Sequence, residues 1–148
     1  MACGGTEWLG RASMSVYIDT APFIYIVEGN PSLADAVDLQ IQKWIDSDED
    51  LLTSCMTLME LLVHPKRMKN RRMEAQYRLF LERLLAFPPF PINERVADQA
   101  ATIRAEYGFK APDALQLATA LVAGADVFYT NDKQLKQFSE LNILLVGE

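Results

Sequence analysis

The sequence predicts an α/β fold, a three-layer α/β/α sandwich whose central parallel sheet has four to five strands. Three observations support this prediction. Short apolar runs alternate with longer segments in which apolar residues recur at three- and four-residue spacing. The short runs show no polar alternation, which is typical of strands buried on both faces. The chain has 148 residues, about the length of one domain, and no internal repeat or linker divides it.

The first half of the chain alternates strands and helices. We expect a strand over 15–19 that ends on Asp19 and a short helix that starts near Pro22, because Asp or Thr before a proline favours a helix start. The next elements expected are an amphipathic helix over 32–46, a buried strand over 51–54, a helix over 56–63 and a longer helix over 69–86. The helix over 56–63 should end before Pro65, because the residue before a proline disfavours the helical conformation.

The second half centres on the stretch FKAPDALQLATALVAGADVFYTND, residues 109–132. This stretch predicts an apolar helix that begins at residues 112–113, a glycine turn and a short buried strand over 127–129. The other elements expected here are a short or edge strand in the proline-rich run 87–92, a helix capped by Asn93 and closed by Gly108, a short helix over 135–140 and a final strand over 143–146.

The composition is that of a soluble globular protein. Half of the residues are hydrophobic and 23% are charged, which argues against disorder. No segment approaches the roughly 18 uninterrupted apolar residues of a membrane helix. Two isolated cysteines without a secretory signal fit a reducing compartment, so we expect a cytoplasmic protein with no membrane partner. Residues 1–13 are expected to be a disordered leader or tag-like segment, and 14–148 a single domain.

The charge distribution is uneven. The net charge of −6 argues against binding nucleic acid by bulk positive charge. Five of the fourteen Lys and Arg residues nevertheless fall within residues 66–72, KRMKNRR: Lys66, Arg67, Lys69, Arg71 and Arg72. This run could contact RNA phosphates near the mouth of a site, or it could be a solvated loop and helix start. The single histidine, His64, is more simply explained as a helix-end residue than as a catalytic one.

Four acidic residues stand at positions where a parallel sheet would bring them together: Asp19, Glu60, Asp113 and Asp132. The strands predicted over 15–19 and 127–129 end at one edge of such a sheet, and the helices that follow the strands start at the same edge. Ligands bind at this edge in open parallel sheets. Four carboxylates there would repel one another unless a cation neutralised them. Oxygen ligands without Cys or His suit Mg²⁺ or Mn²⁺, which can polarise a phosphodiester and help to make hydroxide from water.

Each of these acids also has a simpler structural explanation. Asp19 and Asp113 are suitable helix caps or first-turn acids, and Asp132 could cap the helix after it. Glu60 could lie on a solvated helix face. Capping alone does not explain a glutamate between Met59 and Leu61, so the combination favours a shared site.

The order YIDT, MELL, APDALQLATA and FYTND resembles the PIN domain family, and within it the VapC-like ribonuclease toxins of type II toxin–antitoxin modules. The resemblance covers roughly residues 16–146. It implies a central parallel sheet flanked by helices, a divalent-metal site of three or four acids, and cleavage of RNA. It also implies a small antitoxin partner whose segment fills a groove, and apolar helix stripes favour a homodimer.

Carried over residue by residue, the resemblance makes Asp19, Glu60 and Asp113 the three core acids and Asp132 the fourth. The residues expected to support them are Thr20, Thr130 and Asn131. Some relatives carry a further acid shortly after the fourth, whereas this chain has the sequence KQLK there, so it departs from the pattern of a site that uses an extra acid.

The expected function is therefore that of a Mg²⁺- or Mn²⁺-dependent endoribonuclease that cleaves single-stranded or structured RNA. The alternative is a non-catalytic PIN-like module that acts by binding a protein partner. A phosphatase or receiver domain is a weaker third hypothesis, because position 21, where a phosphatase needs its second Asp, is Ala.

Overall fold

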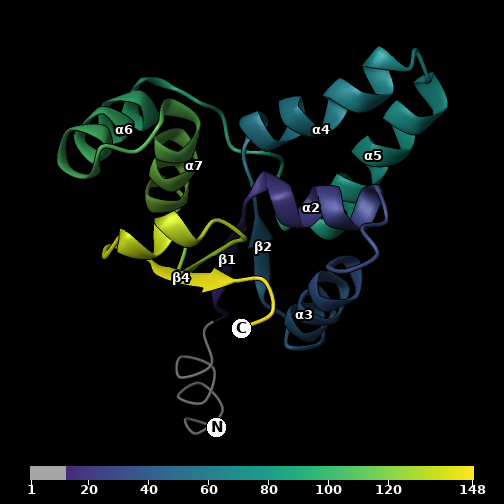
Figure 1. Cartoon of the computed structure of the whole chain (residues 1–148), viewed down its shortest axis with the longest axis horizontal. Helices are drawn as coiled ribbons and strands as arrows, with labels where there is room; N and C mark the ends of the chain where they lie inside the picture. The colour runs from purple at the N-terminus through teal and green to yellow at the C-terminus, as the bar shows by residue number, and fades with distance from the viewer. Residues whose placement is uncertain (1–12) are drawn as a thin grey trace, which may run out of the picture.

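The computed structural model describes residues 13–148 and is built around a parallel sheet of four strands in the order β2-β1-β3-β4 (Figure 1). The strands are β1 (Ser15–Ile18), β2 (Asp50–Leu52), β3 (Val127–Thr130) and β4 (Asn142–Leu145). The predicted parallel sheet is confirmed, with four strands. Residues 1–12, nearly all of the segment predicted to be a leader, lie outside the described residues.

Six α-helices and one 3₁₀ helix surround this sheet in the described part of the chain. They are α2 (Thr20–Val27), α3 (Ala34–Asp46), α4 (Cys55–Arg67), α5 (Arg71–Leu84), α6 (Glu94–Tyr107), α7 (Ala111–Val122) and the 3₁₀ helix η1 (Lys133–Gln137). Helices α6 and α7 lie on one side of the sheet, and α2, α3 and α5 on the other (Figure 1). The predicted three-layer α/β/α sandwich is therefore confirmed.

The alternation of side chains along β1 explains why both faces are covered. Tyr17 is fully buried against the α6 and α7 layer and stacks on Phe128 of β3, with ring centroids 5.3 Å apart. Its neighbours Val16 and Ile18 are fully buried in the opposite core, which contains residues of α2, α3 and α5. An apolar strand with no polar face requires this double burial, as its sequence predicted.

Helix α4 corrects the prediction that it would stop before Pro65. It begins at Cys55, runs through Pro65 and ends at Arg67. Pro65 has no N–H and so removes one backbone hydrogen bond from the helix, but its ring is buried against the rest of the protein. The hairpin that leads into α5 also satisfies the late carbonyls of α4, because the backbone nitrogen of Asn70 donates to the Pro65 oxygen at 2.9 Å.

The proline-rich run over 87–92 forms no strand, which corrects the prediction of a short or edge strand. Its one pairing is an isolated parallel bridge between Phe90 and Ser54, in which the Cys55 nitrogen donates to the Phe90 oxygen at 2.8 Å. Prolines at 88, 89 and 91 remove the donors that a longer ladder needs. The helix predicted over 135–140 is instead the short 3₁₀ helix η1, two residues earlier.

The predicted ends of α6 are confirmed. The side chain of Asn93 accepts a hydrogen bond of 3.0 Å from the Val96 nitrogen, and Gly108 closes the helix with a positive φ of 73°. No helix within residues 13–148 has both the length and the apolar character needed to cross a membrane.

Candidate functional site

The four predicted acids meet at the edge of the sheet where β1 and β3 end. Asp19 directly follows β1 and caps α2, Glu60 lies in the middle of α4, Asp113 lies in the first turn of α7, and Asp132 follows β3 and caps η1. All four line one open pocket of about 290 Å³. The other residues that line it are Thr20, Ala21, Ile24, Pro112 and Gln116.

The Asp19 carboxylate is held by two hydrogen bonds. Its Oδ1 accepts from the backbone nitrogen of Thr20 at 2.8 Å, and its Oδ2 accepts from Thr130 Oγ1 at 2.8 Å. The Asp19 backbone nitrogen donates to the Tyr129 oxygen at 2.9 Å, which continues the pairing of β1 with β3 past the end of the strand. The helix-capping role that the sequence left open is therefore real, and it orients the carboxylate rather than removing it from the pocket.

The pKa values of two acids show that the carboxylates influence one another. Burial raises the pKa of Asp19 from its ordinary 3.8 to about 6, the bonds from Thr130 and Thr20 oppose this, and the charges of Asp113 and Glu60 add to it. Burial also raises the pKa of Asp113, and the charge of Asp132 raises it further. The pocket therefore penalises negative charge, and a bound cation would relieve that penalty.

Glu60 and Asp132 are fixed in different ways. Glu60 lies on an exposed part of α4, and its Oε1 accepts a hydrogen bond of 2.7 Å from Thr20 Oγ1. Asp132 accepts from the Gln134 nitrogen at 3.0 Å through Oδ1, while its own backbone nitrogen donates to Thr130 Oγ1 at 3.1 Å. The Thr130 hydroxyl thus contacts two of the acidic residues, the side chain of Asp19 and the backbone nitrogen of Asp132.

A buried amide beneath the pocket was missed by sequence reasoning. Gln116 of α7 is only 3% exposed. Its Oε1 accepts hydrogen bonds from the Tyr17 hydroxyl and from Ser54 Oγ, the second at 3.1 Å. Its Nε2 donates to Thr20 Oγ1 and Thr57 Oγ1, both at 3.1 Å. The available signal was one glutamine inside the apolar run ALQLATA, where a buried polar group needs partners.

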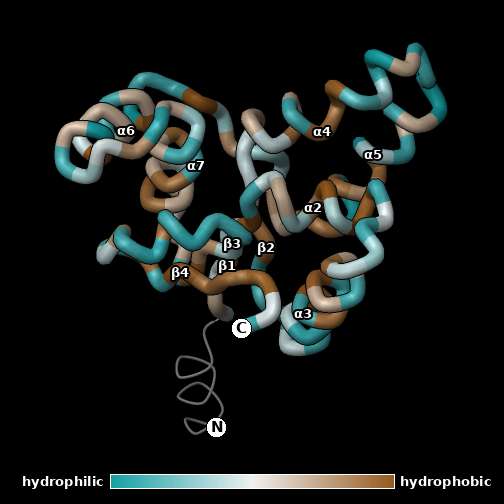
Figure 2. The backbone as a smooth tube through the Cα atoms, viewed as in Figure 1, coloured by the Kyte–Doolittle hydropathy of each residue, from teal (hydrophilic) through white to brown (hydrophobic). Residues whose placement is uncertain are grey.

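The remaining predicted residues do not all reach the site. Asn131 donates to the Tyr25 hydroxyl at 2.9 Å and does not line the pocket. The basic run is exposed at the turn between α4 and α5, and none of its residues lines the pocket. In the views of Figures 1 and 2 this hairpin points away from the sheet, and its tip is hydrophilic. Lys66 Nζ pairs with Glu74 Oε1 at 2.8 Å, and His64 is exposed in the last turn of α4.

The donor chemistry of the pocket fits a hard divalent cation. Its acidic side chains offer oxygen ligands only, and two of them carry raised pKa values because they are crowded and buried. Within residues 13–148, no three Asp, Glu, His or Cys side chains are already close enough to form a complete ligand set. The pocket therefore supplies oxygen ligands of the type that a hard cation prefers, but the carboxylates do not already surround one metal position.

Comparison with known proteins gives a family and a fold. The sequence model of the PIN domain matches residues 16–141. A chain in the structure of VapBC2 from Rickettsia felis bound to a promoter DNA fragment superposes with a TM-score of 0.72 at 17% identity, covering 89% of this chain and 98% of that one. A chain of a toxin–antitoxin complex from Klebsiella pneumoniae gives 0.69 at 23% identity, covering 87% and 95%.

A chain of DNA-bound VapBC from Salmonella typhimurium gives a TM-score of 0.70 at 19% identity, again over 89% and 98% of the two chains. No functionally curated protein sequence matches significantly. At these identities the structural likeness is one of fold, whereas the sequence model covers most of the chain, from the middle of β1 almost to β4. The chain therefore belongs to the PIN domain family.

Proposed function

We propose that this protein is a divalent-metal-dependent endoribonuclease that acts as the toxin of a toxin–antitoxin pair. The observation that carries the proposal is the meeting of four carboxylates from four separate elements in one pocket at the carboxyl edge of the sheet. Nuclease activity is expected of PIN domains, which supports the reaction class.

In this proposal Asp19, Asp113 and Asp132 hold Mg²⁺ or Mn²⁺, and Glu60 completes the metal shell or orients the attacking water. The ion, when bound, polarises the phosphodiester and lowers the pKa of its water. The chain's own contribution is to keep the ligands in place. Asp19 is fixed by the Thr20 backbone and by Thr130, so its carboxylate needs little reordering to bind an ion.

The basic run is proposed to contact RNA phosphates: Lys66, Arg67, Lys69, Arg71 and Arg72. These side chains are exposed on a body whose net charge is −6, so they form a local attractive region on a protein that otherwise repels RNA. Because none of them lines the pocket, we assign them to affinity for flanking parts of a single-stranded or structured RNA, and not to chemistry at the scissile phosphate.

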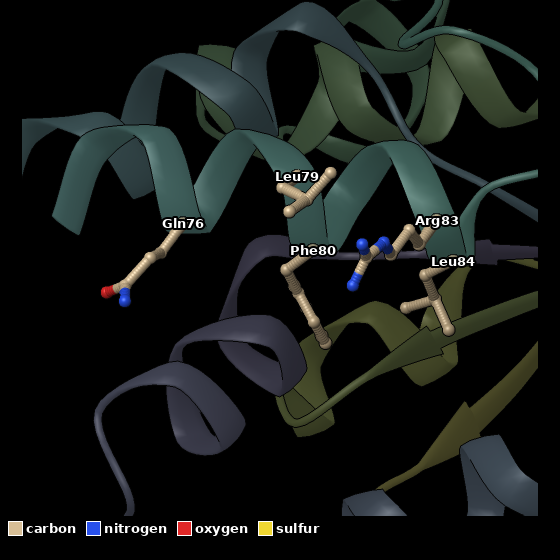
Figure 3. A pocket seen from close by; sticks show the side chains of 5 residues that line it. All are labelled: Gln76, Leu79, Phe80, Arg83 and Leu84. Carbon is tan, nitrogen blue, oxygen red and sulfur yellow. The ribbon is translucent and has the colours of Figure 1, made fainter. Parts of the chain in front are cut away.

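A small antitoxin protein is the proposed partner, since three of the structures with this fold are described as VapBC or toxin–antitoxin complexes. A homodimer is also proposed. Exposed apolar side chains support it, among them Leu79 of α5, which is 42% exposed. Leu79, Phe80 and Leu84 line a shallow hollow of about 330 Å³ together with Gln76 and Arg83 (Figure 3).

Cleavage of a mixed RNA pool tests the proposed function. Wild type and Asp19→Asn are incubated with Mg²⁺ or Mn²⁺, and in parallel with EDTA. We expect cleavage by wild type with metal only, because the substitution removes a ligand charge while its amide oxygen can still cap α2. If both folded proteins are inert with any partner removed, the nuclease assignment fails and a non-catalytic partner-binding module becomes the better explanation.

A further inference from the structure

The amide of Gln116 joins the elements that build the pocket. Tyr17 belongs to β1, Thr20 to α2 and Thr57 to α4, and Ser54 directly precedes α4. All four contact one side chain of α7 that is almost fully buried. A side-chain amide has two acceptor sites and two donor protons, so Gln116 uses its entire hydrogen-bonding capacity here.

The contact between Thr20 and Glu60 fixes which way this amide points. Thr20 Oγ1 lies 2.7 Å from Glu60 Oε1 and 3.3 Å from Thr57 Oγ1. A carboxylate can only accept, and its bond is much the shorter, so the single hydroxyl proton of Thr20 goes to Glu60. Thr20 must then accept from Gln116, which places Nε2 and not Oε1 beside it, in agreement with the hydrogen bonds observed. The reverse orientation of the amide would draw the Thr20 proton to Gln116 and leave Glu60 without its donor.

Glu60 depends on this donor more than Asp19 and Asp132 depend on theirs. Asp19 accepts from the backbone nitrogen of the next residue, Thr20, and Asp132 accepts from that of Gln134, two residues on. Within the described part of the chain, the Glu60 side chain accepts one hydrogen bond, and it comes from Thr20. Glu60 is exposed on α4 and has a long flexible side chain, so without that bond its carboxylate is free to turn into solvent.

We propose that Gln116 is a positioning residue that acts through the Thr20 hydroxyl to hold the Glu60 carboxylate toward the pocket as one of the metal ligands. The inference rests on the proposed metal-dependent function and adds a residue to which no role was assigned from sequence. Groups behind metal ligands orient them, and their loss commonly weakens metal binding about 10- to 100-fold.

Binding of Mn²⁺ alone, measured by calorimetry without RNA, tests this inference. Gln116→Met keeps the approximate volume and deletes the four hydrogen bonds, while Thr20→Val deletes only the hydroxyl. Thr20→Ser keeps that hydroxyl and serves as the rescue variant. Thr57→Val is the matched control. Thr57 is fully buried, accepts a bond of 3.1 Å from Gln116 and lies 3.3 Å from Thr20 Oγ1, so its loss disturbs the same network, but it contacts none of the four acids. Thermal melts verify that each variant is folded.

We expect Gln116→Met and Thr20→Val to weaken Mn²⁺ binding by similar factors, about tenfold each. The double variant should be little worse than either single one, because both act through one contact. Thr20→Ser and Thr57→Val should bind within about twofold of wild type. If Gln116→Met does not fold, Thr20→Val set against Thr57→Val still decides whether the hydroxyl beside Glu60 matters.

Two results would overturn the inference: wild-type Mn²⁺ affinity in Thr20→Val or Gln116→Met, or an equal loss in Thr57→Val, which would indicate general loosening. A wild type that binds no Mn²⁺ would overturn it as well. Failure of the proposed function looks different, since wild type would then bind Mn²⁺ with the expected dependence on Gln116 but leave RNA intact with any partner removed.

Discussion

Thr130 Oγ1 donates a hydrogen bond of 2.8 Å to Asp19 Oδ2, so the residue that ends β3 holds the acid that follows β1. The two strands are parallel neighbours, which brings their carboxyl ends to the same edge although the residues are 111 positions apart in the chain. Thr130 is fully buried, and its Oγ1 also accepts a hydrogen bond from the Asp132 backbone nitrogen. One hydroxyl therefore couples two of the four acidic positions.

Replacing Thr130 with valine keeps the shape of the side chain and removes this hydroxyl. The bond from Thr130 lowers the pKa of Asp19 against the larger effect of burial, so we expect the pKa to rise above its present value of about 6. Carboxyl carbon chemical shifts followed through a pH titration of the metal-free protein measure the change. Thr130→Ser is the control, and titration of Asp19 at or below the wild-type pKa in Thr130→Val would contradict the assignment.

The raised pKa of Asp19 makes the metal-free protein less stable as pH rises. A folded-state pKa of about 6 against an ordinary 3.8 means that the folded state binds the proton more tightly than the unfolded state. The stabilisation is complete below about pH 4 and is lost as pH rises through about 6. At about 1.4 kcal/mol per pKa unit the effect is about 3 kcal/mol.

Urea unfolding of wild type and Asp19→Asn between pH 4.5 and 7.5, with EDTA present, measures this effect. Asparagine carries no charge and can still cap α2, so the variant should lose this part of the pH dependence and be the more stable protein at pH 7.5. Parallel stability profiles for the two proteins would show that Asp19 titrates near its ordinary value.

Divalent metal should raise the melting temperature of wild type at pH 7.5. An ion that binds only the folded state stabilises it by about 2.7 kcal/mol at one hundred times its dissociation constant. Asp113→Asn should lose most of this gain, because it removes a charge from the pocket. Asp98→Asn on the exposed side of α6 is a control with the same change in charge and should respond like wild type. Equal shifts in all three proteins would place the ion elsewhere.

Three of the four acids that line the pocket are tied to a local signal in the sequence. Asp19 ends an apolar run before a proline, Asp113 follows Pro112 at a helix start, and Asp132 ends the run FYTND. Once the strands are taken as parallel, these signals specify one edge of one sheet. The pocket shared by the four side chains follows from that topology.

What the sequence could not supply is the set of contacts made between distant elements. Gln116 meets Tyr17, Ser54 and Thr57 across 99, 62 and 59 positions of the chain, and no periodic pattern encodes those pairings. The end of α4 was missed for a related reason. A local rule ended the helix before Pro65, whereas tertiary burial of that proline and packing against α5 keep the helix intact.

The basic hairpin should govern RNA affinity without setting the rate of the chemical step. Arg71 and Arg72 are exposed and lie outside the pocket, so Arg71→Gln/Arg72→Gln should weaken RNA binding several-fold and reduce its salt dependence by a slope of about 1.4 for two lost phosphate contacts on a single strand. Single-turnover cleavage at saturating protein should stay near the wild-type rate. The control is Lys43→Gln/Arg95→Gln, which lowers the net charge by the same amount at exposed sites on α3 and α6. It shows how much of the effect comes from the overall charge of the protein. If both double variants weaken binding equally, the protein attracts RNA through its overall charge and the hairpin has no special role.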